Sequence, residues 1–276
     1  MHRRSRGKRG FFLRRIERNR NEVIFWGVTF VAACGALLVA TAAVSREPSF
    51  AIRSVEVRGA EVVPAESIEA AVREAFGGSY AGIIEKGNRI FYPRQGVIAA
   101  ARSVSERIAF AAVSVEKHVL EISVSERAPR GRWCGRAVQA GGADEPPCYL
   151  FDASGYLFAE AGSEAPSPKI FGPLVNDERA LIGGSIAPRV LAVLNGLEER
   201  LLFAGIPLAS LLALPEDDFL LVTESGVKIL FTGKIKLEAF LASLYAALKT
   251  DNLKERLDAG MIEYIDFRFD DKVFYK

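Results

Sequence analysis

Few residues of this chain are of the types that perform catalysis. The 276-residue sequence has only two histidines, His2 near the start and His118 between two predicted strands. A serine or cysteine nucleophile therefore has no well-placed imidazole base to recruit, although Ser-Lys catalysis stays formally open. The HExxH, P-loop and GxGxxG patterns are also absent from the sequence. We accordingly expect no enzymatic activity, no metal or other cofactor and no small-molecule substrate.

Neighbouring carboxylates occur at Asp217-Asp218 and at Asp270-Asp271. A pair of carboxylates is the machinery of glycoside hydrolysis, so each pair is a candidate acid–base site. Both pairs fall at predicted turns, where solvated acids are ordinary. We expect them to be turn residues.

The last residues, EYIDFRFDDKVFYK, suggest recognition through backbone hydrogen bonds instead of catalysis. Ile265, Phe267 and Phe269 alternate with polar residues, which is the period of a half-buried strand. A strand at the edge of a sheet leaves a row of N–H and C=O groups open to another chain. Adding a partner strand there is a known mode of recognition. We expect Ile265 and Phe267 to lie in the core, whereas Phe269 could face either way.

Cys134 and Cys148 bracket thirteen residues rich in glycine and proline. If both face an oxidising compartment, a disulfide is the natural inference, and closing such a loop contributes about 3 kcal/mol. The alternative is a pair of reduced or metal-binding cysteines, which no close CxxC or neighbouring histidine supports. Cys34 lies in an apolar stretch and acts there as a small apolar residue.

That stretch, Val23 to Val44, is twenty-two residues long without a charge. As a helix it is about 33 Å long, close to the thickness of a hydrocarbon core. Residues 1–22 carry nine Arg and Lys against Glu17 and Glu22, so the positive-inside rule places this basic arm in the cytoplasm. We interpret the basic arm as the cytoplasmic flank of this span, and we expect no nucleic-acid partner.

The sequence allows two other interpretations of this segment. Ala40-Thr41-Ala42 forms an A-x-A pattern, so the segment could be a cleaved signal peptide. The apolar stretch is longer than the usual signal core of 7–15 residues, which favours an uncleaved anchor. A buried core helix is disfavoured because every face is apolar and the flank is strongly basic.

The extracytoplasmic part predicts two modules. Residues 50–127 read as strand, two helices and a hairpin, with helices near 64–76 and 94–106. Residues 128–147 form a Gly/Pro-rich loop, and residues 148–276 alternate strands with two amphipathic helices near 188–203 and 234–248. The predicted fold class is α+β: a transmembrane helix at 23–44, then two α+β domains, the second with a mostly antiparallel sheet and a C-terminal edge strand.

The first module, with IRSVEVRGAEVV and LEISVSERAPRGRW, resembles the POTRA domain of the FtsQ/DivIB family of bacterial cell-division proteins. Val124 to Pro129 matches the V-x-E-R-x-P signature of that family. CYLFDASGYLF, with Asp152 and Gly155 at its turn, is similar to the first hairpin of its β-domain, and IDFRFDDKVFYK is similar to its closing strand. The resemblance covers nearly the whole chain, but the loop IIEKGNRIFYP departs from it. In that loop Phe91 and Tyr92 either form an exposed patch or tuck under the sheet.

The resemblance implies a scaffold of the divisome at the septum of the inner membrane, with partners of the FtsB/DivIC and FtsL type. It also implies that the closing strand receives a strand of such a partner. Arg268 follows the I/V-D-x-R pattern of the family, Phe269 stands at an aromatic contact position, and the edge continues through Lys272, Val273, Phe274 and Tyr275. Two alternatives are a POTRA-type periplasmic chaperone or secretion module and an anchored cell-wall hydrolase.

Overall fold

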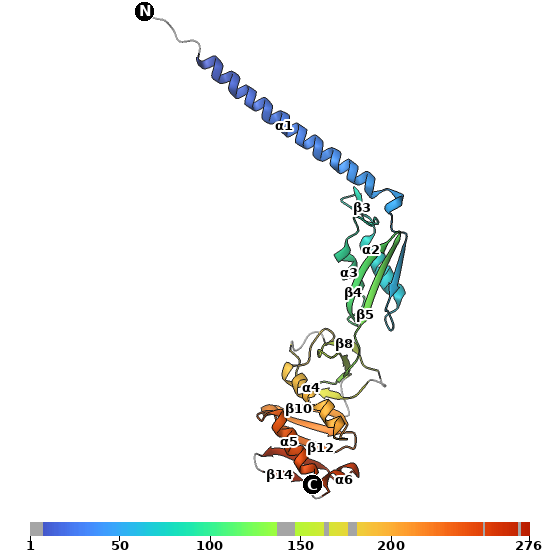
Figure 1. Cartoon of the computed structure of the whole chain (residues 1–276), viewed down its shortest axis with the longest axis vertical. Coiled ribbons are helices and arrows are strands. Elements are labelled where there is room, and N and C mark those ends of the chain that lie inside the picture. The colour runs from blue at the N-terminus through green and yellow to red at the C-terminus, as the bar shows by residue number, and fades with distance from the viewer. Residues whose placement is uncertain (1–7, 137–146, 163–165, 176–180, 251, 270–271) are drawn as a thin grey trace, which may run out of the picture. The chain divides into compact units, whose positions relative to one another are not determined.

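The computed structural model describes residues 8–136, 147–162, 166–175, 181–250, 252–269 and 272–276 (Figure 1). The chain divides into two compact units. Unit 1 comprises Met1–Val104 and Ala111–Val124, and unit 2 comprises Ser105–Phe110 and Ser125–Lys276. The protein is of the α+β class, with a long apolar helix, a small α/β region and a large mixed sheet.

The first helix, α1 (Lys8–Ser45), is longer than the predicted span because it also includes most of the basic arm. Within it, Glu22–Ser45 has a mean hydropathy of 2.3 and is long and apolar enough to cross a membrane. This segment is consistent with a single membrane span or with a signal sequence. The described side chains from Glu22 to Ala40 are all exposed, so the helix is no part of a soluble core.

Unit 1 holds most of a three-stranded sheet whose order is β1-β5-β4. The strand β1 pairs in parallel with β5, and α2 packs against both β1 and α3. The residues that are buried are those that the predicted helix and strand periods placed on the core face: Ile68, Val72 and Phe76 on α2, and Leu120 and Ile122 on β5. The elements are β1 (Ser54–Arg58), α2 (Ala65–Phe76), α3 (Arg94–Ser103), β4 (Ile108–Glu116) and β5 (Val119–Glu126).

The connection between α2 and α3 contains a small hairpin that the sequence did not predict. Its strands are β2 (Ser79–Tyr80) and β3 (Ile84–Glu85), and β3 lies against the end of α1 (Figure 1). Phe91 and Tyr92, which follow the hairpin, are half-buried.

Unit 2 is built on a nine-stranded sheet of order β14-β13-β12-β11-β10-β9-β6-β7-β8. The sheet is mixed: most of its described strand pairs are antiparallel, as expected, whereas the pairs β10–β9, β12–β13 and β6–β9 run parallel. The strands at its centre are β9 (Lys169–Phe171), β10 (Leu208–Ala213), β11 (Asp218–Thr223) and β12 (Lys228–Thr232). Those nearer the ends are β6 (Gly131–Trp133), β7 (Tyr149–Phe151), β8 (Leu157–Glu160), β13 (Tyr264–Phe269) and β14 (Lys272–Tyr275).

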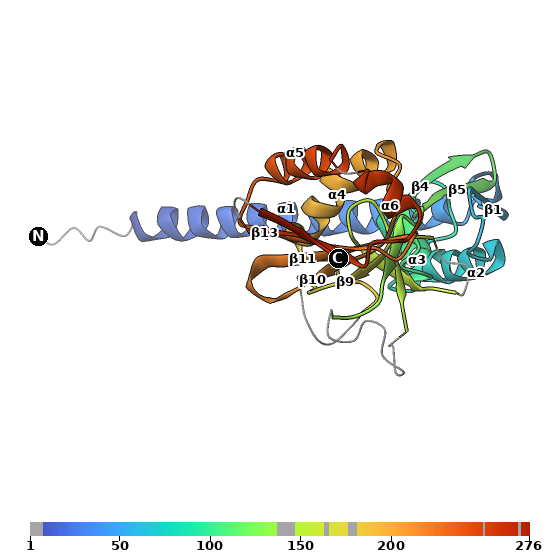
Figure 2. The same ribbon diagram turned by 90° about the horizontal axis from the view of Figure 1, so that it is seen from below.

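Three helices cover one face of this sheet: α4 (Pro188–Phe203), α5 (Leu237–Leu248) and α6 (Leu253–Asp258) (Figure 2). Leu194 and Leu197 of α4 and Phe240 and Leu244 of α5 are buried together with the inward side chains of the strands. The free energy of this burial follows from apolar area removed from water, and each such side chain contributes about 1.5–3 kcal/mol.

The segment 128–147, expected as a loop, supplies a strand to this sheet. Gly131–Trp133 forms β6, which pairs with both β7 and β9. Next to it the structure joins Cys134 and Cys148 in a disulfide, which packs with Phe171 and Leu212 on the face away from the helices. Residues 137–146 of the predicted loop lie outside the described residues.

The β7–β8 hairpin turns at Asp152 and Gly155, as expected. Gly155 has a φ of +81°, a conformation that favours glycine. The Asp152 carboxylate accepts hydrogen bonds from Ser154 and from Arg127, the latter at 2.5 Å. Burial by itself would raise the pKa of Asp152, but these hydrogen bonds outweigh it and hold the pKa below its ordinary value.

Candidate partner-binding edge

The end of the chain forms a hairpin where a single closing strand was expected. β13 pairs with β12 in parallel, and β14 folds back antiparallel on β13, so the last strand of the sheet is β14. Ile265 and Phe267 are buried beneath the helices, as predicted, because the alternation of β13 places both on its core face. Asp270 and Asp271, which join the two strands, lie outside the described residues.

The structure brings the six predicted contact residues together on this hairpin. Arg268 and Phe269 end β13, and Phe269 is 54% exposed, which answers the open question about its direction. Lys272, Val273, Phe274 and Tyr275 make up β14 and are all exposed. The predicted edge therefore exists, but β14 forms it by turning back rather than by prolonging β13.

The backbone of β14 is paired on one side only. Lys276 donates its N–H to the Tyr264 carbonyl at 3.2 Å and accepts from the Glu263 N–H at 2.7 Å, so both of its backbone groups face β13. A strand directs its backbone groups alternately to its two sides. Those of Val273 and Tyr275 therefore point away from β13, where no strand follows in the described part of the sheet.

Arg268 and Asp266 lie on the face of β13 opposite the helices. The guanidinium donates to the Asp266 carboxylate at 2.7 Å and reaches Asp218 on β11 at 3.3 Å. The hydrogen bonds from Arg268 outweigh the burial of Asp266 and hold the pKa of Asp266 below its ordinary value. The same two carboxylates raise the pKa of Arg268. Arg268 thus ties the hairpin to the sheet, which is a structural use of the residue expected to contact a partner.

Aromatic side chains cluster around the two strands of the hairpin. Phe269 and Phe274 contact each other edge to face, with ring centroids 5.2 Å apart. The Arg256 guanidinium of α6 lies 5.6 Å from the centroid of the Tyr275 ring. Large apolar groups held on an exposed edge are typical of a recognition surface.

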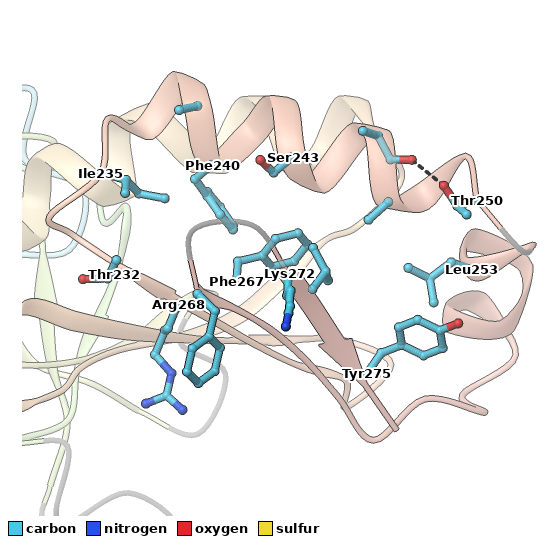
Figure 3. A pocket seen from close by; sticks show the side chains of 15 residues that line it. Thr232, Ile235, Phe240, Ser243, Thr250, Leu253, Phe267, Arg268, Lys272 and Tyr275 are labelled. Atoms are coloured by element: carbon cyan, nitrogen blue, oxygen red, sulfur yellow. Dashed lines mark hydrogen bonds between the residues drawn. The ribbon is translucent and has the colours of Figure 1, made fainter.

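Between α5 and the hairpin lies a groove of about 560 Å³ (Figure 3). Phe240 of α5 and Phe267 of β13 meet at its floor with centroids 5.4 Å apart, whereas the Arg268 guanidinium points away from α5 (Figure 3). Sequence reasoning missed the α5 wall. Its signal was a run of small residues at helical spacing: Ala239, Ser243, Ala246 and Thr250.

The other candidate residues, Asp217, Asp218 and His118, make contacts within the fold. Asp218 binds Arg268, and Asp217 forms an ion pair with Arg189. The His118 ring Nδ1 lies 2.8 Å from the Ala51 carbonyl oxygen, beside the turn that precedes β5. In the described ranges no three His, Cys, Asp or Glu residues gather as metal ligands would. The arrangement offers backbone pairing and apolar contact as its chemistry.

No known protein-family model matches this chain, and no curated protein matches it.

Proposed function

We propose that this protein is a single-span scaffold of the bacterial division machinery, of the kind that the FtsQ/DivIB resemblance implies, and that it performs no catalysis. It would join a small bitopic complex of the FtsB/DivIC and FtsL type to synthesis of the septal wall. The observation that carries the proposal is β14: an exposed, apolar strand at the open end of a nine-stranded sheet.

The proposed anchor is the apolar part of α1, in the inner membrane with the basic arm in the cytoplasm. Packing at the end of this helix supports a retained anchor over a cleaved signal. Ala42 and Ser45 are buried in its last turn, and the Ser45 hydroxyl accepts a hydrogen bond from the Glu85 N–H at 3.1 Å. Cleavage after Ala42 would divide this packed turn.

The proposed identity of the first module is a POTRA domain. Support comes from its element order, in which β1, α2, α3, β4 and β5 follow one another, and from the sheet order β1-β5-β4. The inserted β2–β3 hairpin is the departure from the family that IIEKGNRIFYP already indicated.

The proposed binding mode is strand addition at β14. The backbone groups of Val273 and Tyr275 would pair with an extended segment of the partner, which supplies affinity. Side chains that alternate along that segment would contact Phe269 and Phe274 on the hairpin or enter the groove beside α5, which supplies specificity.

The test replaces Val273 by proline in the full chain and measures binding of the FtsB/DivIC-type protein from the same genome. Proline removes the outward N–H and blocks one hydrogen bond of the added strand, while the β13 side of β14 keeps its own. We expect an affinity loss of at least about tenfold, or ~1.4 kcal/mol.

Val273→Ala is the matched control, because it removes the side chain and keeps the N–H. It should bind within a few-fold of the original protein. Equal binding by Val273→Pro and the original chain would remove strand addition at β14 from the proposal. A fluorescent fusion that stays off the division site in dividing cells would remove the divisome assignment itself.

A further inference from the structure

The β2–β3 hairpin and the residues after it are fastened to the end of α1. Asn88, only 1% exposed, donates its side-chain N–H groups to the carbonyl oxygens of Val44 and Ser45, each at 3.1 Å. The last carbonyls of a helix have no partner within the helix, and Asn88 gives those of Val44 and Ser45 a buried side-chain donor, beside the Glu47 N–H that binds the Val44 carbonyl at 3.2 Å. The Glu85 N–H binds the Ser45 hydroxyl from the hairpin side.

The place of this joint along α1 fixes the depth of the hairpin. The uncharged stretch ends at Val44, and over about 33 Å of helix it matches a hydrocarbon core. Ala42, inside that stretch, and Ser45 are the residues of the last turn that are buried. The protein that covers them must stand where the hydrocarbon ends and the headgroups begin.

At that level the hairpin region exposes side chains suited to a lipid boundary. We call Tyr80, Ile83, Lys86, Arg89 and Ile90 the boundary patch. Its three apolar members are each more than 40% exposed. The Lys86 ammonium lies 5.3 Å from the Tyr80 ring centroid, and Arg89 lies over the ring of Phe50. Glu85 is the acidic residue within the hairpin, and it is half-buried.

We propose that the boundary patch inserts into the headgroup region of the outer leaflet of the membrane that α1 spans. Tyrosine rings with their polar tips favour this interface, and Lys and Arg extend their charges toward lipid phosphates while their stems stay in apolar surroundings. The patch belongs to the segment that is bonded to the end of the span, and its cations complement anionic lipid. The domain after the span is thereby held against the bilayer in one orientation. This inference rests on the proposed membrane anchor.

The experiment places nitroxide labels on the full chain in nanodiscs of phosphatidylethanolamine and phosphatidylglycerol. A label on the native Cys34 reports the span, since Cys34 is a free cysteine in α1. In a Cys34→Ala background, Ile83→Cys and Ile90→Cys report the patch. Val62→Cys is the matched control. Val62 is exposed in the same unit, and it follows the C-terminal end of β1, which is the end farther from α1.

Collision rates with oxygen and with a water-soluble nickel complex then give the depth of each label. We expect an oxygen-to-nickel ratio several-fold higher at residues 83 and 90 than at residue 62. If Cys34 reads as lipid while residues 83 and 90 match residue 62, the boundary patch is wrong and the anchor stands. If Cys34 itself reads as water, the anchor is wrong, and the patch with it.

A second variant tests the joint without changing the patch. Asn88→Asp keeps the size of the side chain but cannot donate to both helix carbonyls, because a carboxylate donates nothing and a carboxylic acid has a single O–H. We expect the residue 83 label to shift toward the value of residue 62 in this variant. A ratio that stays unchanged would overturn the inference that Asn88 holds the patch at the membrane.

Discussion

The two ends of the large sheet are treated in opposite ways. At the β8 end, the Leu157 N–H donates to the Gly184 carbonyl and the Leu157 carbonyl accepts from the Gly183 N–H, both at 2.8 Å. A further bridge joins Tyr156 to Ser185, so the chain itself covers the start of this edge. At the β14 end every described residue of the strand is exposed. The exposed side chains on this hairpin include four that are aromatic or branched: Phe269, Val273, Phe274 and Tyr275.

Natural sheets usually protect their edges, because unpaired backbone groups beside apolar side chains invite association with other chains. Protection at one end of this sheet and exposure at the other are what the proposed strand addition at β14 requires. The difference singles out β14 as the edge at which the proposed partner strand would add.

The largest effect should come from the core under the open edge. Phe240 is fully buried between Phe231, stacked at 4.3 Å, and Phe267. Phe240→Ala should lower the free energy of unfolding by about 3–5 kcal/mol, because it opens a cavity beneath β13. Denaturant titration of the full chain measures the change.

Phe203→Ala is the control for that substitution, since Phe203 ends α4 with 93% of its surface exposed. Its effect should stay within about 0.5 kcal/mol. If both variants lost the same free energy of unfolding, the packing of Phe240 beneath β13 would not stabilise the open edge.

The next prediction breaks the covered edge. Gly183 has a φ of +92°, and nothing lies closer than 3.8 Å to a Cβ built there, so Gly183→Ala adds backbone strain without a clash. We expect a loss of about 1–2 kcal/mol and faster hydrogen exchange at the Leu157 amide.

Gly162→Ala provides the comparison, because Gly162 has open space around it and an ordinary φ. That variant should keep both stability and slow exchange at Leu157. Unchanged exchange in Gly183→Ala would show that residues 183–186 do not protect β8.

The smallest effect concerns the attachment of the open hairpin and depends on pH. The folded pKa of Asp266 lies below its unfolded value of about 3.9, so its charge stabilises the fold above about pH 4. This contribution is lost as the pH falls through the folded pKa. Asp266→Asn should cost on the order of 1 kcal/mol at neutral pH, since the Arg268 side chain is partly exposed.

Stability curves of the two proteins should converge as the pH falls from about 4 through the lower pKa of folded Asp266, and they should meet once Asp266 is protonated in both states. Asp152 titrates in the same window, but it is present in both proteins and cancels in the difference. A difference that grows toward low pH would contradict the assignment.

Much of the fold follows from local pattern. The helices at 65–76, 94–103, 188–203 and 237–248 lie where the period of apolar residues placed them, although α3 ends before the predicted residue 106 and α5 begins after the predicted residue 234. β13 shows its predicted core residues because strand alternation is equally local. Short elements whose pairing depends on distant segments were missed, such as the three-residue β6 and β9.

The candidate site shows the same division. Its six residues were named from the sequence, and Asp270-Asp271 were expected at a turn, but residues 272–275 were expected to continue the edge rather than to fold back antiparallel on β13. The joint of Asn88 with α1 spans more than forty residues of sequence and left no local signal. Backbone capping between distant segments becomes visible only when the chain is folded.

The most direct measurement is hydrogen exchange at the Val273 and Tyr275 amides of the full chain, with and without the FtsB/DivIC-type partner. In the free protein both amides should exchange rapidly, and partner binding should slow them by about tenfold or more while Leu157 stays unchanged. Slow exchange in the free protein, or no slowing when the partner is bound, would contradict an open edge that accepts a partner strand.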